Sequence, residues 1–208
     1  KTEADNGTET EFNADASRLQ KLRQGQAGFA RWKMKAMPLL VGFAPNDFLR
    51  AALYRPALFG HAYSRWLRTI FSRSPHWTQG ERELFAVATS AKPLSFLQAS
   101  HAAVAAHVDP EALELLDDRE ACARKSPRLA AMLEFLDRLA SDPQSLAPAD
   151  AERLRTAGVS PEAAVQAIHV SAASHVINRI ADALDFEIPP ERDRRRMARF
   201  VAWFGYRS

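Results

Sequence analysis

The sequence contains one cysteine and six histidines, and these side chains limit the chemistry that it can perform. Cys122 has no second cysteine with which to pair, so the chain by itself cannot carry out dithiol redox chemistry. His101 is more informative, because it belongs to a stripe of apolar residues at helical spacing and is predicted to face the interior. Proton transfer near neutral pH is the functional interpretation of such a histidine. A hydrogen-bonded core histidine is the structural one.

Two helices separated by a break are predicted to hold this part of the chain. Residues 78–91 begin with a capping-box-like pattern, and Lys92-Pro93 ends them. A second helix, residues 94–108, presents one inward stripe: Leu94, Leu97, His101, Val104, Ala105 and Val108. Glu83 lies on the first helix and is able to face the same interior, which favours a functional pair with His101. Alternatively, Glu83 is the N3 member of the helix-start box and only reaches back to a backbone amide.

The remainder of the chain predicts an all-α fold. From residue 17 onward, helical patterns are punctuated by proline and glycine, and no segment alternates with the period of two that marks a strand. Residues 17–208 are long enough for one helical domain, whereas residues 1–16 are acidic and poor in apolar side chains, which predicts a disordered arm or an expression remnant. Start and stop signals are clearest for three later helices, at 127 to about 141, 148 to about 158 and 161 to about 184.

Composition argues against several classes of partner. No apolar run approaches the roughly 18 residues of a membrane span, and a lone cysteine is typical of a reducing compartment, so we expect a cytoplasmic protein without a membrane partner. The net charge is only +3. The basic residues 192–199 precede Phe200, Trp203, Phe204 and Tyr206, and this pattern is more typical of a closing helix with a solvated face and an aromatic face on the core than of a nucleic-acid site. We therefore expect no nucleic-acid partner.

Two stretches around the helix break resemble a known superfamily. RELFAVATSA before the break and ASHAAVAAH after it resemble the core motif of the carboxymuconolactone decarboxylase and alkylhydroperoxidase D superfamily. The later run LAPADAERLRTAGVSPEAAVQAIHVSAASHVINRIADALDF is similar to its C-terminal half, with a Gly-bounded turn and the dipeptide Asn178-Arg179. The resemblance implies an alkylhydroperoxidase D-like helical bundle that assembles as a homo-oligomer: a dimer, trimer or hexamer.

The peroxidase branch of this superfamily carries a CxxC pair at the start of the second helix, and this chain lacks it. Counted back from His101, the cysteine positions fall on Leu94 and Leu97; counted forward from Glu83, they fall on Ser95 and Gln98. In either alignment there is no thiolate to attack a peroxide and no disulfide to recycle. CxxC-dependent peroxidase activity is therefore not expected. A peroxidase that uses an external thiol would require Cys122 to be reactive. The sequence instead favours the interpretation that Cys122 is an incidental thiol without a function.

The decarboxylase branch needs no cysteine, and its chemistry is what the resemblance implies here. His101 would be the general acid or base, and Glu83 would orient it and stabilise its charge. Ser100, His175 and Arg179 are the candidates for binding a small organic acid, with Arg179 or His175 as the positive partner. His175 also shares a stripe with apolar residues, which is typical of a core histidine. The reaction would be a decarboxylation or an isomerisation.

No cofactor or metal is expected for this chemistry. The glycines are scattered singly, so no phosphate loop is formed, and the histidines lack ligand spacing with Cys, Asp or Glu. The rival hypothesis is a catalytically degenerate homologue that binds a ligand or acts as a scaffold. The two hypotheses differ in the role of His101. The enzyme hypothesis requires His101 for turnover of a small-molecule substrate, and the scaffold hypothesis does not.

Overall fold

The structure, a computed structural model, describes residues 28–54, 59, 61–72, 74–89, 95–111 and 113–205. Every regular element within these ranges is a helix, which confirms the all-α prediction. Four sequence predictions concern residues outside the described ranges: the arm at residues 1–16, the start of the domain at residue 17, and the break at Lys92-Pro93 with the stripe residue Leu94. The fourth is the aromatic residue Tyr206.

The helices follow one another closely along the chain. Their bounds are α2 (Gly28–Val41), α3 (Asp47–Tyr54), α5 (His61–Phe71), α6 (Gln79–Ala88), α7 (Phe96–Val108), α8 (Glu114–Asp117), α9 (Arg119–Lys125), α10 (Pro127–Ser141), the 3₁₀ helix η1 (Pro143–Ser145), α11 (Pro148–Thr156), α12 (Pro161–Ala183) and α13 (Glu191–Phe204). The predicted helices at 127–141, 148–158 and 161–184 are confirmed as α10, α11 and α12. In α12, Ser160 caps the helix by accepting a hydrogen bond from the backbone N–H of Ala163, and Pro161 occupies the first turn.

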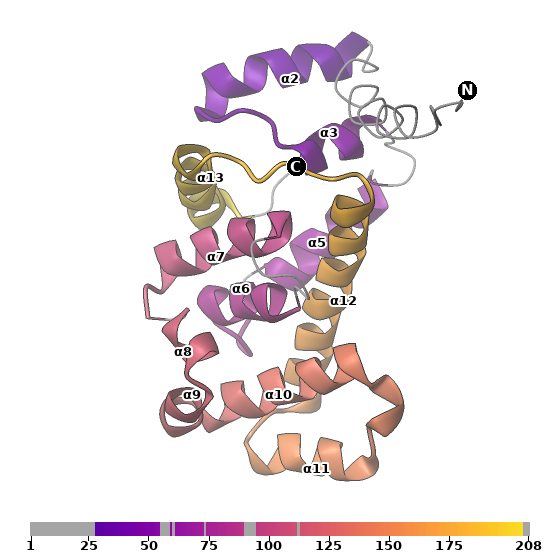
Figure 1. The fold of residues 1–208 in the computed structure, drawn as a ribbon, viewed down its shortest axis with the longest axis vertical. Coiled ribbons are helices and arrows are strands. Elements are labelled where there is room, and N and C mark those ends of the chain that lie inside the picture. The colour runs from indigo at the N-terminus through magenta and orange to yellow at the C-terminus, as the bar shows by residue number, and fades with distance from the viewer. Residues whose placement is uncertain are drawn as a thin grey trace, which may run out of the picture.

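The α6 and α7 helices lie together in the middle of the molecule (Figure 1), with α2 and α3 toward one end and α10 and α11 toward the other. The long α12 helix packs against both α6 and α7. This arrangement puts the segment that carries Glu83 and His101 at the centre of the fold.

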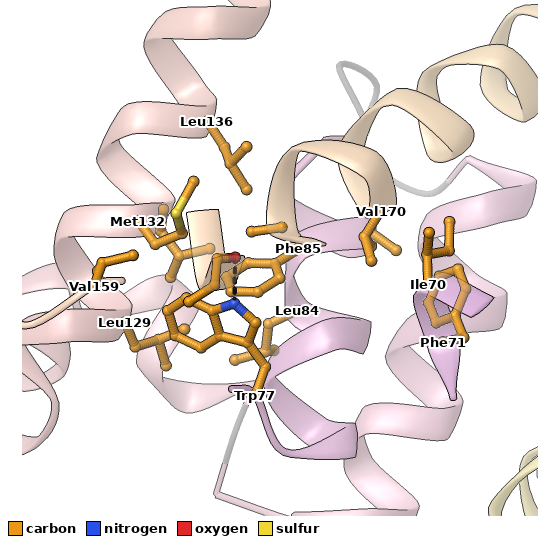
Figure 2. Close-up of a cluster of buried hydrophobic side chains, with 14 of the residues drawn as sticks. Ile70, Phe71, Trp77, Leu84, Phe85, Leu129, Met132, Leu136, Val159 and Val170 are labelled. Carbon is orange, nitrogen blue, oxygen red and sulfur yellow. Dashed lines mark hydrogen bonds between the residues drawn. The ribbon is translucent and has the colours of Figure 1, made fainter. Parts of the chain in front are cut away.

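One hydrophobic core surrounds α6. Trp77, just before α6, is almost fully buried, and its ring lies edge-on to Phe85 with centroids 4.9 Å apart. Figure 2 shows the Trp77 indole directed at a backbone oxygen, which is that of Ala163, and the N–H donates to it over 2.7 Å. This bond satisfies the buried polar atom of Trp77 and ties the start of α6 to the start of α12.

The last helix, α13, was expected to pack its aromatic residues against the core. Its buried residues are Ala198 and Val201, which pack against Val104 of α7. Trp203 is 82% exposed and Phe204 52% exposed, so the prediction that these aromatic residues cover the core is wrong. Trp203 follows Val201 by two residues, which is about 200° around a helix and therefore the opposite side.

The sequence predicts that no segment is long and apolar enough to span a membrane. None of the helices within the described ranges has the length and apolar character needed to cross a bilayer.

Candidate functional site

Glu83 and His101 are in direct contact. The Nδ1 atom of His101 lies 2.5 Å from the Oε2 atom of Glu83. Glu83 has no exposed surface, and His101 is only 6% exposed. The contact is therefore a buried, charge-assisted hydrogen bond in which the ring N–H donates to the carboxylate. The predicted pair is thus brought together, and its catalytic role stays a prediction.

The start of α6 explains why Glu83 is directed inward. The capping box uses Glu81, not Glu83: the Thr78 side chain accepts from the Glu81 N–H over 3.2 Å, and the Glu81 carboxylate accepts from the Thr78 N–H over 2.7 Å. The alternative in which Glu83 serves as the N3 residue of that box is therefore wrong. Glu83 lies two residues further along, which turns it by about 200° toward the core.

The His101 ring is held on one face as well as at Nδ1. The ring of Phe71, at the end of α5, stacks on it with centroids 5.5 Å apart and planes 15° apart. Phe71 was not among the residues that sequence reasoning selected, because α5 and α7 are separated along the chain and no local pattern links them. Together Phe71 and Glu83 restrict the imidazole to one orientation.

Such a pair is suited to proton transfer. With Nδ1 bonded to Glu83, the tautomer and orientation of the imidazole are set, and the proton exchanged with another molecule belongs at Nε2. A buried carboxylate next to the ring stabilises the imidazolium that forms when His101 accepts a proton. Such an arrangement can therefore take part in general acid–base chemistry.

His175 and Arg179 line a cavity of about 470 Å³ between α12, the end of α6 and the start of α7. Ser95, the N-cap of α7, and Asp137 of α10 also line it. Burial, helped by the charge of Arg179, lowers the pKa of His175, so this side chain is neutral at pH 7. Partial burial raises the pKa of Asp137, opposed by its ion pair with Arg119. Among the described lining residues, Arg179 is the cation, and the acids Asp137 and Asp182 line the same cavity.

The other predicted substrate residue does not join this cavity. The Ser100 hydroxyl is buried and donates to the Phe96 carbonyl of its own helix over 2.8 Å. Glu83 and His101 do not line the cavity either. The structure thus brings together two pairs, Glu83 with His101 and His175 with Arg179, at neighbouring places in the fold. Ser95 and Asp137 also line the cavity, and sequence reasoning did not select them as candidates for binding. For Ser95 a signal was present, because one alignment assigns it a cysteine position of the superfamily.

Cys122 is fully buried in the main hydrophobic core. Burial raises the pKa of its thiol, with Arg119 acting in the opposite direction. A thiol with a raised pKa and no exposed surface is a poor nucleophile. The geometry therefore offers no support for a peroxidase that works through Cys122. A search of the described residues also finds no group of three or more His, Cys, Asp or Glu side chains placed to hold a metal ion.

Comparison with known proteins gives matches among solved structures only. No family model matches the sequence. No curated protein matches it either. The crystal structure of an alkylhydroperoxidase AhpD core, an uncharacterized peroxidase-related protein from Ralstonia eutropha, superimposes with a TM-score of 0.65 and 25% sequence identity, covering 86% of this chain and 93% of that one. An uncharacterized peroxidase-related protein from Silicibacter superimposes with a TM-score of 0.65 and 20% identity, covering 79% of this chain and 86% of that one. The protein therefore has the alkylhydroperoxidase D-like fold, which confirms the superfamily resemblance seen in its sequence.

Proposed function

We propose that this protein is a cofactor-free enzyme that performs acid–base chemistry, a decarboxylation or an isomerisation, on a small organic acid. The observation that carries the proposal is the buried contact of 2.5 Å between Glu83 and His101. Burying a carboxylate costs free energy unless the carboxylate is paired. A histidine held in one orientation by that carboxylate is suited to transfer a proton near neutral pH.

The proposed chemistry uses His101 as the proton carrier. In a decarboxylation, the bond between the substrate carboxylate and its neighbouring carbon breaks, and the electron pair passes to an adjacent lactone carbonyl as an enolate. The imidazolium of His101 then delivers a proton from Nε2 to the carbon. In an isomerisation, neutral His101 first removes a proton and later returns it to a different carbon. Glu83 stabilises the imidazolium in both reactions.

Arg179 is the proposed anchor for the substrate carboxylate. It lies with His175 around the cavity of about 470 Å³, where a guanidinium can hold a carboxylate by two parallel hydrogen bonds. Ser95 borders this cavity at the start of α7, six residues before His101, which corresponds to about 9 Å along a helix axis. A substrate anchored at Arg179 must therefore extend along the first turns of α7 to reach His101.

That separation favours a second candidate, a catalytically degenerate homologue that binds a small ligand. In this case the cavity lined by His175 and Arg179 retains its ligand, while Glu83 and His101 contribute only to packing. The separation between the two pairs is the observation that supports it, because neither Glu83 nor His101 lines the cavity.

The test is turnover of a panel of lactone acids, followed by absorbance and by release of carbon dioxide. If the enzyme proposal holds, His101→Asn and Glu83→Gln lower kcat by about 100-fold or more, as expected for loss of a general acid–base group. His107→Asn, an exposed residue on the same helix, is the matched control and leaves kcat unchanged. Circular dichroism must show that each variant folds.

The ligand-binding candidate predicts a different result. The wild type then turns over none of the panel, calorimetry detects binding of one of the acids, and Arg179→Gln weakens that binding while His101→Asn leaves it unchanged. This outcome would contradict the enzyme proposal.

A further inference from the structure

A second and larger cavity, of about 1080 Å³, lies on the other side of α7. Its walls come from α7, the end of α6, residues 113–119 and α13. The α7 residues that line it include Ala99, Ala102, Ala103 and Ala106, which lie about 100–200° around the helix from His101. One face of α7 therefore carries His101 into the core, and the opposite face forms this cavity. Ala88, at the end of α6, borders both cavities, but this site does not rest on the proposed function.

The floor of the cavity is apolar. Four alanines of α7 leave space that larger side chains would fill, and Leu113 and Leu116 close it on another side. A cavity of this size is in the range that holds a small organic molecule with an extended body. These residues provide apolar surface for that body, and Gln98 and His107 of α7 add polar side chains to the lining.

The rim of the cavity is cationic. Four arginines line it, against two acids, Asp117 and Glu191; the arginines are Arg119, Arg194, Arg195 and Arg199. The α13 contribution follows from helical spacing, since residues 191, 194, 195, 198 and 199 share one face of a helix. His107 is the remaining titratable side chain on this rim.

Two of the four arginines already have carboxylate partners. Arg195 pairs with Glu191 one turn earlier, and Arg119 pairs with Asp137. Arg194 instead donates to the Pro189 carbonyl over 2.7 Å, which holds its guanidinium in place. Its charge also helps to lower the pKa of Glu191, but the ion pair of that carboxylate is with Arg195. Arg199 has no carboxylate partner within the described part of the chain. The positive charge of Arg194 and Arg199 is therefore available beside the apolar floor.

We propose that this cavity binds an amphipathic anion, a carboxylate or phosphate group attached to an apolar body. The apolar body lies on the alanine floor of α7, and the anionic group is held by Arg194 and Arg199. Arginine suits this role because its planar guanidinium matches both carboxylate and phosphate oxygens. The positive charge of the arginines disfavours the binding of cations. The apolar surface of the alanines favours a ligand with an apolar body over an anion without one.

The test compares four probes by isothermal calorimetry at fixed salt: decanoate, decyl phosphate, decylammonium and inorganic phosphate. Decanoate or decyl phosphate is expected to bind at least about tenfold more tightly than the other two, because only they present both an anion and an apolar chain. The stronger of the two identifies the preferred anionic group. Each probe is used below its micelle concentration.

Variants of the rim and the floor assign the binding to this cavity. The double variant Arg194→Gln/Arg199→Gln should weaken decanoate or decyl phosphate binding at least about tenfold, and Ala102→Phe should weaken it by filling the floor. Arg192→Gln, an exposed arginine of α13 that does not line the cavity, is the matched control and should leave the affinity unchanged. Circular dichroism and thermal melting establish that every variant is folded.

Three results would overturn the proposal. The first is equal binding of decylammonium and decanoate, which would mean that charge does not select the ligand. The second is no binding of either anionic amphiphile to the wild type. The third is an unchanged affinity in the double arginine variant; if its sedimentation coefficient also changes, this face is an interface between protein chains.

Discussion

Glu83 and His101 illustrate how a paired side chain helps a buried charge to be tolerated. A carboxylate with no exposed surface loses its hydration, and the Nδ1–H of His101 replaces part of it at 2.5 Å. The stacked ring of Phe71 adds packing on the other side of His101. Removing one member of the pair therefore costs more than losing a hydrogen bond, because the remaining charge stays buried.

This reasoning gives a prediction for stability at the residue scale. His101→Ala should lower the free energy of unfolding by about 3–5 kcal/mol, since it removes the hydrogen bond of His101 to the buried Glu83 carboxylate. The double variant Glu83→Leu/His101→Leu should cost less than the sum of the two single variants, because no buried charge remains. Urea denaturation measures all of these values. Additive losses would mean that the two side chains are not coupled.

The helix termini around α6 and α7 position the pair at the scale of the element. Thr78 and Glu81 cap the start of α6 reciprocally, and the Ser95 side chain accepts from the Gln98 N–H at the start of α7. These caps determine where each helix begins and therefore which residues face inward. A displaced start would rotate Glu83 away from His101.

Thr78→Ala tests the cap of α6. The loss of its side-chain hydrogen bond to the Glu81 N–H should lower the free energy of unfolding by about 1 kcal/mol. Thr156→Ala, an exposed threonine at the end of α11, is the control and should change stability by less than about 0.5 kcal/mol. Thermal and urea denaturation measure both. An equal effect of the two substitutions would show that the box does not stabilise α6.

Large apolar side chains on the surface are the main feature at the scale of the whole molecule. Leu39 and Leu40 of α2 are 90% and 78% exposed, and Trp32 and Trp203 are also exposed. Exposed apolar groups of this size are typical of surfaces that another protein covers. They add support to the homo-oligomer expected from the superfamily resemblance, which stays a prediction.

Sedimentation velocity tests this expectation directly. The wild type should sediment as a dimer, trimer or hexamer, and Leu39→Glu/Leu40→Glu should shift it toward the monomer by placing two charges in an apolar contact. The control Ala149→Glu changes an exposed residue of α11, at the other end of the molecule, and should leave the assembly unchanged (Figure 1). A monomer at all concentrations of the wild type would contradict the prediction.

The sequence by itself determined the features that depend on neighbouring residues. The all-α fold, the bounds of α10, α11 and α12 and the inward stripe of α7 all follow from caps, prolines and helical periodicity, whose effects act within a turn or two of the chain. The absence of a CxxC pair is a matter of composition. The superfamily resemblance was visible for the same reason, since each of its motifs is a continuous stretch of the sequence.

The tertiary structure alone decided which of these surfaces meet. Whether Glu83 contacts His101, whether Ser100 reaches the His175 and Arg179 cavity, and where Trp203 points depend on how helices distant in sequence pack against one another. The cavity between α7 and α13 also depends on packing, because its alanines and the arginines of α13 come from segments about ninety residues apart. Helical periodicity specifies the faces of each helix, and packing between helices selects the partner of each face.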